Sequence, residues 1–328
     1  MDSGIHIRIR LRRLALGGVI LLSLLQAGCQ AEPTLTITLG GDVILGRDGE
    51  AIFSHNPWGE LDQEEILADG SQNWFMINLE SPLAGDGEAK VSEEEGYNLC
   101  APSEAAGILK MGGVDLISTA NNHQFDCLES ADLSQVMPAI RHVFEAQPVF
   151  IKSPAGLLAI IAVDAISKPL DMTTLLVTAT EMRAESDLLI VSLHWGVEYA
   201  GEPTQLQRDQ AKQLANAGVD VLWGHHPHVL QPAEWVDSED GSHHMLALYS
   251  LGNLLTDQTM TYATRHSALV QLRFQGGEIS QLSFQPLVLM QKDGRLGLAH
   301  PSEDEVARIR ERLDWNQVLE SLPKTNFH

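Results

Sequence analysis

The stretch from Val221 to His228 (VLWGHHPH) most constrains what this chain can fold into, because an apolar run ends abruptly at a glycine and three histidines. The apolar part is typical of a strand buried inside a sheet. Imidazole is the commonest metal ligand near neutral pH, since a ring nitrogen is free to bind there. The pattern therefore predicts a buried strand that delivers metal ligands from its carboxyl end.

The same pattern recurs four more times along the chain. In each case a short apolar run, rich in β-branched residues, leads into an Asp, Glu, Asn or His. The runs are 34–39, 74–79, 114–119 and 188–193, and the polar residues after them are Asp42, Glu80, Asn121 to His123, and His194. In open α/β sheets, ligands bind beyond the carboxyl ends of the strands. Five strands that end at one edge would build a single site from distant parts of the chain.

Helical and strand patterns alternate before residue 230, which favours an α/β fold with a mostly parallel sheet. Pro138 indicates a kink in one expected helix, and Gly218 suits the end of another. Residues 274–278 (FQGGE) predict a hairpin turn between later, antiparallel strands. The expected helices are 103–111, 128–142, 204–217 and 303–322, and the expected later strands are 245–249, 267–274 and 279–287.

Composition narrows the classes of partner. The chain has 328 residues, which allows one large domain, and its hydrophobic fraction of 44% is ample for a core. A formal net charge of −23 argues against nucleic acid as a partner, because binding to phosphates needs Lys and Arg. An anionic substrate stays compatible with this charge, since a bound metal supplies a local positive field.

The first residues have the pattern of an export signal. Arginines between Arg8 and Arg13 precede an apolar run, Leu14 to Leu25, that is shorter than the roughly 20 residues needed to span a bilayer. Ala27-Gly28-Cys29 resembles a bacterial lipobox, so we expect a lipoprotein-type signal peptide at 1–28, lipid on Cys29 and a tether at 29–34. Ordinary signal-peptidase cleavage and an uncleaved anchor helix are the alternatives. All three place the domain outside the cytoplasm, and the first makes it a membrane-anchored lipoprotein of the bacterial cell envelope.

Two further cysteines, Cys100 and Cys127, lie near the expected site. An oxidising compartment permits a disulfide between them. Their separation in space does not follow from the sequence, and two free thiols are the expectation.

The polar residues at the strand ends form a candidate metal-ligand set: Asp42, Glu80, Asn122, His194, His226 and His228. Mixed carboxylate, amide and imidazole ligands suit Mn, Zn or Fe. Six ligands exceed the needs of one tetrahedral site. They suffice for one or two divalent transition metals, a pair lying roughly 4 Å apart with a bridging carboxylate, as in metal-dependent hydrolases.

Six motifs carry a resemblance to a known family. They are GGDVILGR at 40–47, NLESPL at 78–83, ANNHQFD at 120–126, HWGVEY at 194–199, GVDVLWGHHPHVLQP at 218–232 and YSLGNLLTDQ at 249–258. Together they resemble the CapA family of capsule or poly-γ-glutamate biosynthesis proteins, within the calcineurin-like metallophosphoesterase superfamily. The resemblance implies two facing mixed β-sheets flanked by helices in four αββα layers. It places this domain at 35–300, followed by a C-terminal helical segment at 301–328.

The resemblance also implies roles for single residues. Asp42 would open the first metal site, Glu80 would bridge, and His226 and His228 would serve one metal each. Asn122 and His194 would complete the second site. His123 would act as an acid near the leaving group, oriented by Asp126, while His225 would lie outside the ligand set. One departure is clear, since the superfamily's Asp-x-His motif here reads Asp42-Val43-Ile44.

The expected function is therefore a CapA-type role in capsule or exopolymer biosynthesis, with a metal-dependent hydrolase-like site. The alternative is a non-enzymatic assembly factor whose degenerate site binds polymer. The expected partners are an anionic envelope polymer or its precursor, capsule-synthesis proteins, and the membrane through a lipid anchor, but no nucleic acid. Arg47 and Asn253 are candidate substrate-binding residues, with a surface salt bridge as the other interpretation of Arg47.

Overall fold

The computed structural model describes residues 34–47, 55–59, 61, 72–85, 98–127 and 130–323. The chain from Thr34 onward is one compact unit. The expected signal peptide and Cys29 lie outside the described residues. Among the residues that are described, no helix is both long enough and apolar enough to cross a membrane.

The larger sheet has eight strands within the described part of the chain, in the order β14-β13-β12-β1-β2-β3-β4, with β11 beside β1. Strands β1 to β4 run parallel, whereas β12, β13 and β14 form an antiparallel meander. The bounds are β1 Thr34–Val43, β2 Gln72–Leu79, β3 Leu116–Ser118, β4 Arg141–Val143, β11 Asn253–Leu255, β12 His266–Gln275, β13 Glu278–Lys292 and β14 Arg295–Ala299.

The smaller sheet has six strands in the described residues, in the order β5-β6-β7-β8-β10-β9. Its four central strands are parallel, and both edge strands are antiparallel to their neighbours. The bounds are β5 Val149–Ser153, β6 Gly156–Asp164, β7 Leu188–His194, β8 Val221–His225, β9 Ala233–Asp237 and β10 His244–Leu248.

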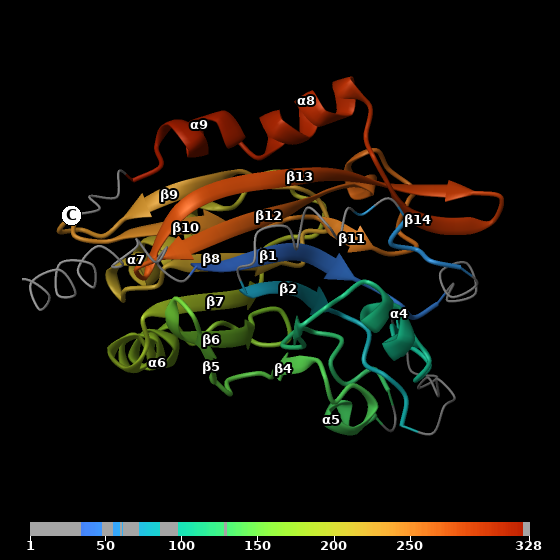
Figure 1. Cartoon of the computed structure of the whole chain (residues 1–328), viewed down its shortest axis with the longest axis horizontal. Helices are drawn as coiled ribbons and strands as arrows, with labels where there is room; N and C mark the ends of the chain where they lie inside the picture. The colour runs from blue at the N-terminus through green and yellow to red at the C-terminus, as the bar shows by residue number, and fades with distance from the viewer. Residues whose placement is uncertain are drawn as a thin grey trace, which may run out of the picture. The chain divides into compact units, whose positions relative to one another are not determined.

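The two sheets face each other across the main hydrophobic core (Figure 1). Leu39 and Met76 of the larger sheet and Ile190 and Trp223 of the smaller one belong to this core and are buried. Trp223 Nε1 also donates to the carbonyl of Gly40 at 2.9 Å, which joins the sheets near their carboxyl ends.

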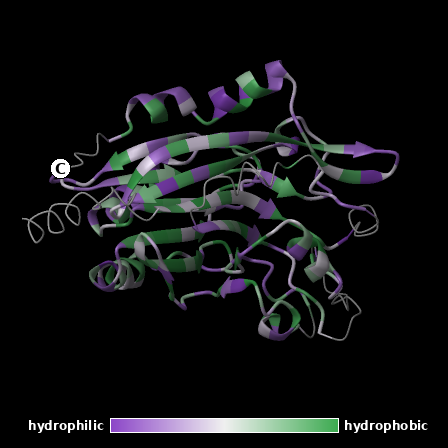
Figure 2. Ribbon diagram, in the orientation of Figure 1, coloured by the Kyte–Doolittle hydropathy of each residue, from purple (hydrophilic) through white to green (hydrophobic). Residues whose placement is uncertain are grey.

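Helices cover the outer face of each sheet. Helix α4 (Ala105–Met111) packs on the larger sheet, and α6 (Met172–Glu185) and α7 (Gln205–Asn216) pack on the smaller one. Apolar residues dominate the central strands β6 and β7 in Figure 2, as burial on both faces requires. The expected fold class, two mixed sheets flanked by helices, is confirmed.

The helix expected at 204–217 is confirmed as α7, and it begins where a capping box satisfies its first amides. Thr204 accepts from the backbone N–H of Gln207, and the Gln207 side chain accepts from the N–H of Thr204. Gly218 follows with φ +84°, a conformation that favours glycine after a helix.

The helix expected at 128–142 ends before Pro138, where a kink or break was expected, and the part after Pro138 is not helical. The structure has a one-turn helix, α5 (Leu133–Val136), and then strand β4, which pairs with β3. Met137 precedes Pro138 and leaves the helical region, with φ −132° and ψ 61°. A residue before proline disfavours helical angles, so the chain turns there into the edge of the larger sheet.

The C-terminal segment forms two helices, α8 (Glu303–Arg312) and α9 (Trp315–Glu320), where one was expected. They meet at Asp314, whose φ of 49° is incompatible with a continuous helix. Both lie along one side of the strands in Figure 1.

Candidate metal centre

The site lies where the carboxyl ends of the two sheets meet. Strand pairing sets this arrangement, because Asp42 on β1 is in register with both Asn78 on β2 and Asn253 on β11. In the smaller sheet, His194 on β7 is in register with His225 on β8. Side chains that can bind a metal therefore meet at the carboxyl ends of the strands of both sheets.

Two glycines permit the close approach of backbones on which this geometry depends. A Cβ at Gly41 would lie 1.9 Å from the carbonyl oxygen of Gly252, and one at Gly224 would lie 2.0 Å from that of Tyr249. The N–H of Asp42 bonds to the same Gly252 carbonyl at 2.9 Å. Glycine is needed at both strand ends because any side chain would push the crossing backbone away.

The structure brings the six predicted ligand residues together. Two histidines flank the carboxylates: His228 Nδ1 lies 3.2 Å from Asp42 Oδ2, and His194 Nε2 lies 3.9 Å from Glu80 Oε1. His194 Nε2 also lies 2.8 Å from the side-chain oxygen of Asn122. The ring of His226 lies 4.9 Å from that of His194, measured between centroids.

Two groups of side chains have the spacing of metal-ligand sets. Asp42, Glu80 and His194 form one, and Glu198, His226 and His228 form the other; within each group the ligand atoms lie within 4.8 Å of one another. Glu198 is not among the six ligands that the sequence predicts. The groups adjoin, since His228 Nε2 lies 3.8 Å from Glu80 Oε2.

Burial removes charge from several of these side chains. It raises the pKa of Glu80 to about 8. It lowers the pKa of His194 well below the usual value. Burial, together with the neighbouring His228, lowers the pKa of His226 to about 4. Glu80 is therefore mainly protonated at pH 7 in the metal-free protein, and His194 and His226 are neutral.

Asp42 and His228 keep their charges despite burial. Burial acts to raise the pKa of Asp42, but hydrogen bonds from His225 and His228 outweigh it and hold that pKa well below its usual range. Burial acts to lower the pKa of His228, but the facing carboxylates of Glu80 and Asp42 outweigh it and raise that pKa to about 9. The metal-free site is thus held together by an ion pair between Asp42 and His228.

Asn78 is a central residue of the site that the sequence analysis missed. Its Nδ2 donates to Asp42 Oδ1 at 2.9 Å and to Glu80 Oε1 at 3.3 Å, and lies 3.4 Å from His194 Nδ1. Its place two residues before Glu80 on one strand was the available signal, because alternate residues share a face. Asn78 orients the ligands without being one of the predicted set.

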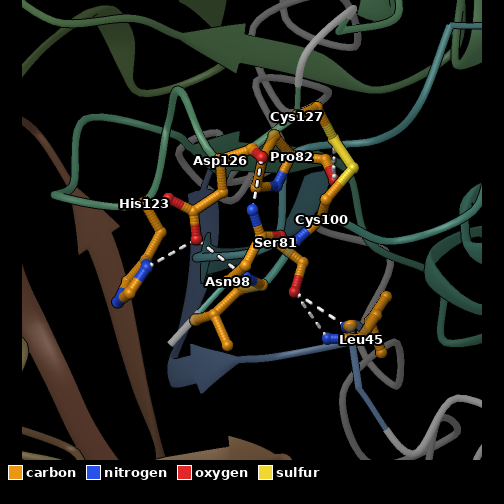
Figure 3. Close-up of a disulfide and its surroundings, with 10 residues drawn as sticks. Leu45, Ser81, Pro82, Asn98, Cys100, His123, Asp126 and Cys127 are labelled. Atoms are coloured by element: carbon orange, nitrogen blue, oxygen red, sulfur yellow. Dashed lines mark hydrogen bonds and ion pairs between the residues drawn. A yellow bond between two sulfur atoms is a disulfide. The ribbon is translucent and has the colours of Figure 1, made fainter. Parts of the chain in front are cut away.

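His123 and Asp126 lie side by side, as Figure 3 shows, and His123 directly follows Asn122, whose side-chain oxygen contacts His194. His123 Nδ1 is 2.8 Å from Asp126 Oδ2, and the same carboxylate oxygen accepts from the N–H of Leu99 at 2.7 Å. Asp126 therefore fixes the ring of His123 and leaves its Nε2 for exchange with a ligand.

The expectation of two free thiols is wrong, because Cys100 and Cys127 form a disulfide (Figure 3). The two segments are already adjacent: Asn98 donates to the backbone oxygen of Asp126 at 2.7 Å, beside the Leu99 bond. The disulfide links the two segments covalently, next to Asp126, which holds His123.

The two candidate substrate-binding residues lie in different surroundings. Arg47 forms an ion pair with Asp257 and is partly exposed. Asn253 is fully buried: its Oδ1 lies 3.1 Å from His228 Nδ1, and its Nδ2 donates to the carbonyl of Thr264 at 3.2 Å. Asn253 therefore orients His228 and holds the adjoining loop, and its contact with substrate stays a prediction.

A cavity of about 560 Å³ opens next to the site. Tyr199 separates the two, since its ring centroid lies 6.1 Å from that of His228. Two cationic side chains from helix α8, Arg308 and Arg312, line the cavity together with Tyr262. Arg308 lies over the Tyr262 ring at 5.3 Å from its centroid.

Comparison with known proteins agrees with the motif resemblance. The sequence matches the family described as bacterial capsule synthesis protein PGA_cap over residues 36–140 and 149–258. It is 26% identical to the capsule biosynthesis protein CapA of Bacillus anthracis, over 88% of this chain and 73% of that protein. It is 24% identical to the PGA biosynthesis protein CapA of Bacillus subtilis strain 168, over 78% and 72% respectively.

Similarity to solved structures is looser. A hypothetical protein from Thermus thermophilus aligns with 76% of this chain and 98% of its own, at a TM-score of 0.49 and 15% identity. A putative 5'-nucleotidase from Staphylococcus aureus aligns with 86% of this chain and 58% of its own, at a TM-score of 0.39 and 14% identity.

Proposed function

Because this chain belongs to the bacterial capsule synthesis protein family PGA_cap, we propose that it acts in synthesis of an anionic polymer of the cell envelope through a metal-dependent hydrolase-like site. One observation carries the proposal. Two buried carboxylates, Asp42 and Glu80, meet buried imidazoles from the other sheet at a junction that opens beside a cavity. Burying polar and charged groups costs free energy, so a cluster of this kind is not expected in a core that serves packing alone.

The side chains fit a divalent transition metal. Among the described residues, Glu80 Oε2 is buried without a hydrogen-bond partner, although an orphaned buried oxygen is costly. Its distance of 3.8 Å from His228 Nε2 is close to the roughly 3.4 Å between two ligands of one tetrahedral metal with bonds of about 2.1 Å. The proposed ligands are Asp42, Glu80, Asn122, His194, His226 and His228, and the donor set suits Mn, Zn or Fe.

A metal bound there supplies Lewis acidity to the phosphoester or amide-type bond that is cleaved. The protein's own side chains transfer the proton and hold the ligands in position. Asp126 holds Nδ1 of His123, so Nδ1 carries the hydrogen of the neutral ring, and Nε2 takes up a second proton and passes it to the leaving group as a general acid. Asn78 keeps both carboxylates oriented.

The cavity beside the site is lined by two arginines, Arg308 and Arg312, and by three acidic residues, Glu202, Glu311 and Asp314. Arg308 and Arg312 lie one turn apart on α8 and face the cavity, and among the described residues neither makes an ion pair with a carboxylate. Guanidinium groups bind carboxylates and phosphates in a bidentate manner. We place part of the polymer in this cavity and the bond to be cleaved at the metal centre.

A second function, binding without catalysis, is favoured by one observation. Ile44 occupies the position where the superfamily has a histidine, and its side chain is completely buried. A centre with fewer ligands binds metal less tightly. In this case the protein holds polymer during assembly and cleaves nothing.

His123→Ala separates the two functions in a strain that lacks the chromosomal gene. The hydrolase proposal predicts at least a tenfold loss of cell-associated anionic polymer while the purified variant keeps its metal, because only proton transfer is removed. His55→Ala, outside the site, is the matched control. Normal polymer with His123→Ala would support the binding function. Normal polymer without the gene would contradict both.

The location of the protein is part of the proposal. We place it in the cell envelope, anchored by lipid on Cys29 beside capsule-synthesis proteins. The wild-type protein and Cys29→Ser are each expressed in the strain that lacks the chromosomal gene. A fatty-acid probe should label the wild-type protein and not Cys29→Ser. Equal labelling of the two would remove the lipid anchor from the proposal.

A further inference from the structure

We propose that Glu198 is a metal ligand, and that with His226 and His228 it completes the centre that Ile44 leaves short of one histidine. The inference rests on the proposed metal-dependent function and adds a ligand to it. Glu198 is not among the ligands that the sequence predicts.

The spacing of the three side chains carries the proposal. One carboxylate oxygen of Glu198 and one ring nitrogen from each of His226 and His228 lie within 4.8 Å of one another. Two imidazoles and one carboxylate are a common ligand set for first-row transition metals. His228 is shared geometrically with the other group, because its two ring nitrogens face Asp42 and Glu80.

The backbone, and not a flexible side chain alone, brings Glu198 to this place. The N–H of Tyr199 donates to the carbonyl of Pro227 at 2.8 Å, between the two histidines. On either side, the N–H of Trp195 donates to the carbonyl of His225 at 3.1 Å, and the Gln231 side chain donates to the carbonyl of Ala200 at 2.8 Å. Three hydrogen bonds thus join the loop after β7 to the histidine turn.

Backbone conformation points the same way. Tyr199, directly after Glu198, has φ +61°, and His226 and His228 have φ +95° and +58°. Residues other than glycine adopt such angles only at a cost in free energy, and that cost is commonly met at ligand sites. Tyr199 adjoins the proposed ligand Glu198, and His226 and His228 are themselves proposed ligands.

Ile44 explains why a substitute is needed. Its side chain is fully buried and has no atom that can bind a metal, and its N–H donates to the carbonyl of Leu255 at 2.8 Å. The carboxylate that makes up for the missing histidine comes from the loop after β7, beside His226 and His228. Glu198 is solvent-exposed, so the centre that it completes should exchange metal more readily than the buried group of Asp42, Glu80 and His194.

The test compares Glu198→Gln with Glu202→Gln in the full-length protein. Glu202 lies in the same loop and is exposed, but it pairs with Arg208 and not with the histidines. Mn²⁺ is the probe, titrated into EDTA-treated protein and followed by electron paramagnetic resonance, with bound metal counted by mass spectrometry. Thermal unfolding in EDTA checks that each variant is folded.

We expect two classes of Mn²⁺ site in the wild type, and a weakening of the weaker class by tenfold or more in Glu198→Gln. Glu202→Gln should match the wild type, and Glu198→Asp should fall between them. Glu198→Gln indistinguishable from Glu202→Gln would overturn this inference and leave the proposed function standing. A wild-type protein that binds no Mn²⁺, Zn²⁺ or Fe²⁺ would overturn both.

Discussion

At the scale of single residues, the site is a set of buried groups whose protonation depends on one another. Glu80 carries its proton in the metal-free protein because burial raises its pKa to about 8. His228 is cationic because Glu80 and Asp42 face it and raise its pKa to about 9 in spite of burial. Positive charge in the metal-free centre therefore comes from His228, at the place where we put a metal.

Metal affinity should consequently rise with pH. Metal binding requires both Glu80 and His228 to lose their protons, so protons compete with the metal below pH 8 to 9. Between pH 6 and 7 we expect affinity to rise about tenfold for each proton released. Calorimetry in two buffers of different ionisation enthalpy counts those protons, and a value near zero at pH 7 would contradict the assignment.

At the scale of elements, strand ends and helix ends follow local sequence closely. The runs beginning at Trp74, Leu188 and Val221 lie in strands β2, β7 and β8, and the hairpin turn between β12 and β13 forms as predicted. Their apolar composition and flanking turn residues contain the necessary information. The strand expected at 245–249 is β10, which is antiparallel to β9 but parallel to β8. The helical prediction at 128–142 failed after Pro138, because pairing of β4 with β3 outweighs a weak helical pattern there.

The contact between β8 and the residue after β10 gives a prediction about glycine. Gly224→Ala would place a Cβ 2.0 Å from the carbonyl oxygen of Tyr249, so backbone must move. We expect the free energy of unfolding to fall by about 2–3 kcal/mol. Urea denaturation measures it.

Gly107→Ala is the matched control, because a Cβ there meets nothing within 4 Å in the interior of α4. Alanine costs less conformational entropy in a helix, so this variant should be more stable by about 0.5–1 kcal/mol. Equal effects of the two substitutions would mean that crossing backbones do not limit Gly224.

At the scale of the whole molecule, the C-terminal helices complete the core between the sheets. Ile309, Leu313, Trp315 and Val318 are buried in that core. The ring of Trp315 lies 4.9 Å from that of Phe284 on β13. A segment whose sequence is largely polar thus covers the apolar interior with one face of each helix, and its arginines line the cavity beside the site.

Trp315→Ala tests this role. Trp315 is 1% exposed, so its truncation should lower the free energy of unfolding by about 3–5 kcal/mol. Leu319 lies on the same helix but is 39% exposed, and Leu319→Ala should cost less than about 1 kcal/mol. Thermal or urea unfolding compares them. Similar losses in both variants would show that α9 is not part of the core.

The sequence by itself determined the strands, the residues at their ends, and the family, because these depend on local periodicity and on motifs. That Asp42 and Glu80 would lie side by side followed from the rule that parallel strands present ligands at one edge, whereas His194 reaches them from the other sheet. Only the tertiary structure decided which groups touch. Asn78 among the carboxylates, Glu198 beside the histidine turn, and the bond between Cys100 and Cys127 depend on how two sheets and their loops pack against each other. Such distances are set by contacts between segments far apart in the chain, which no local pattern encodes.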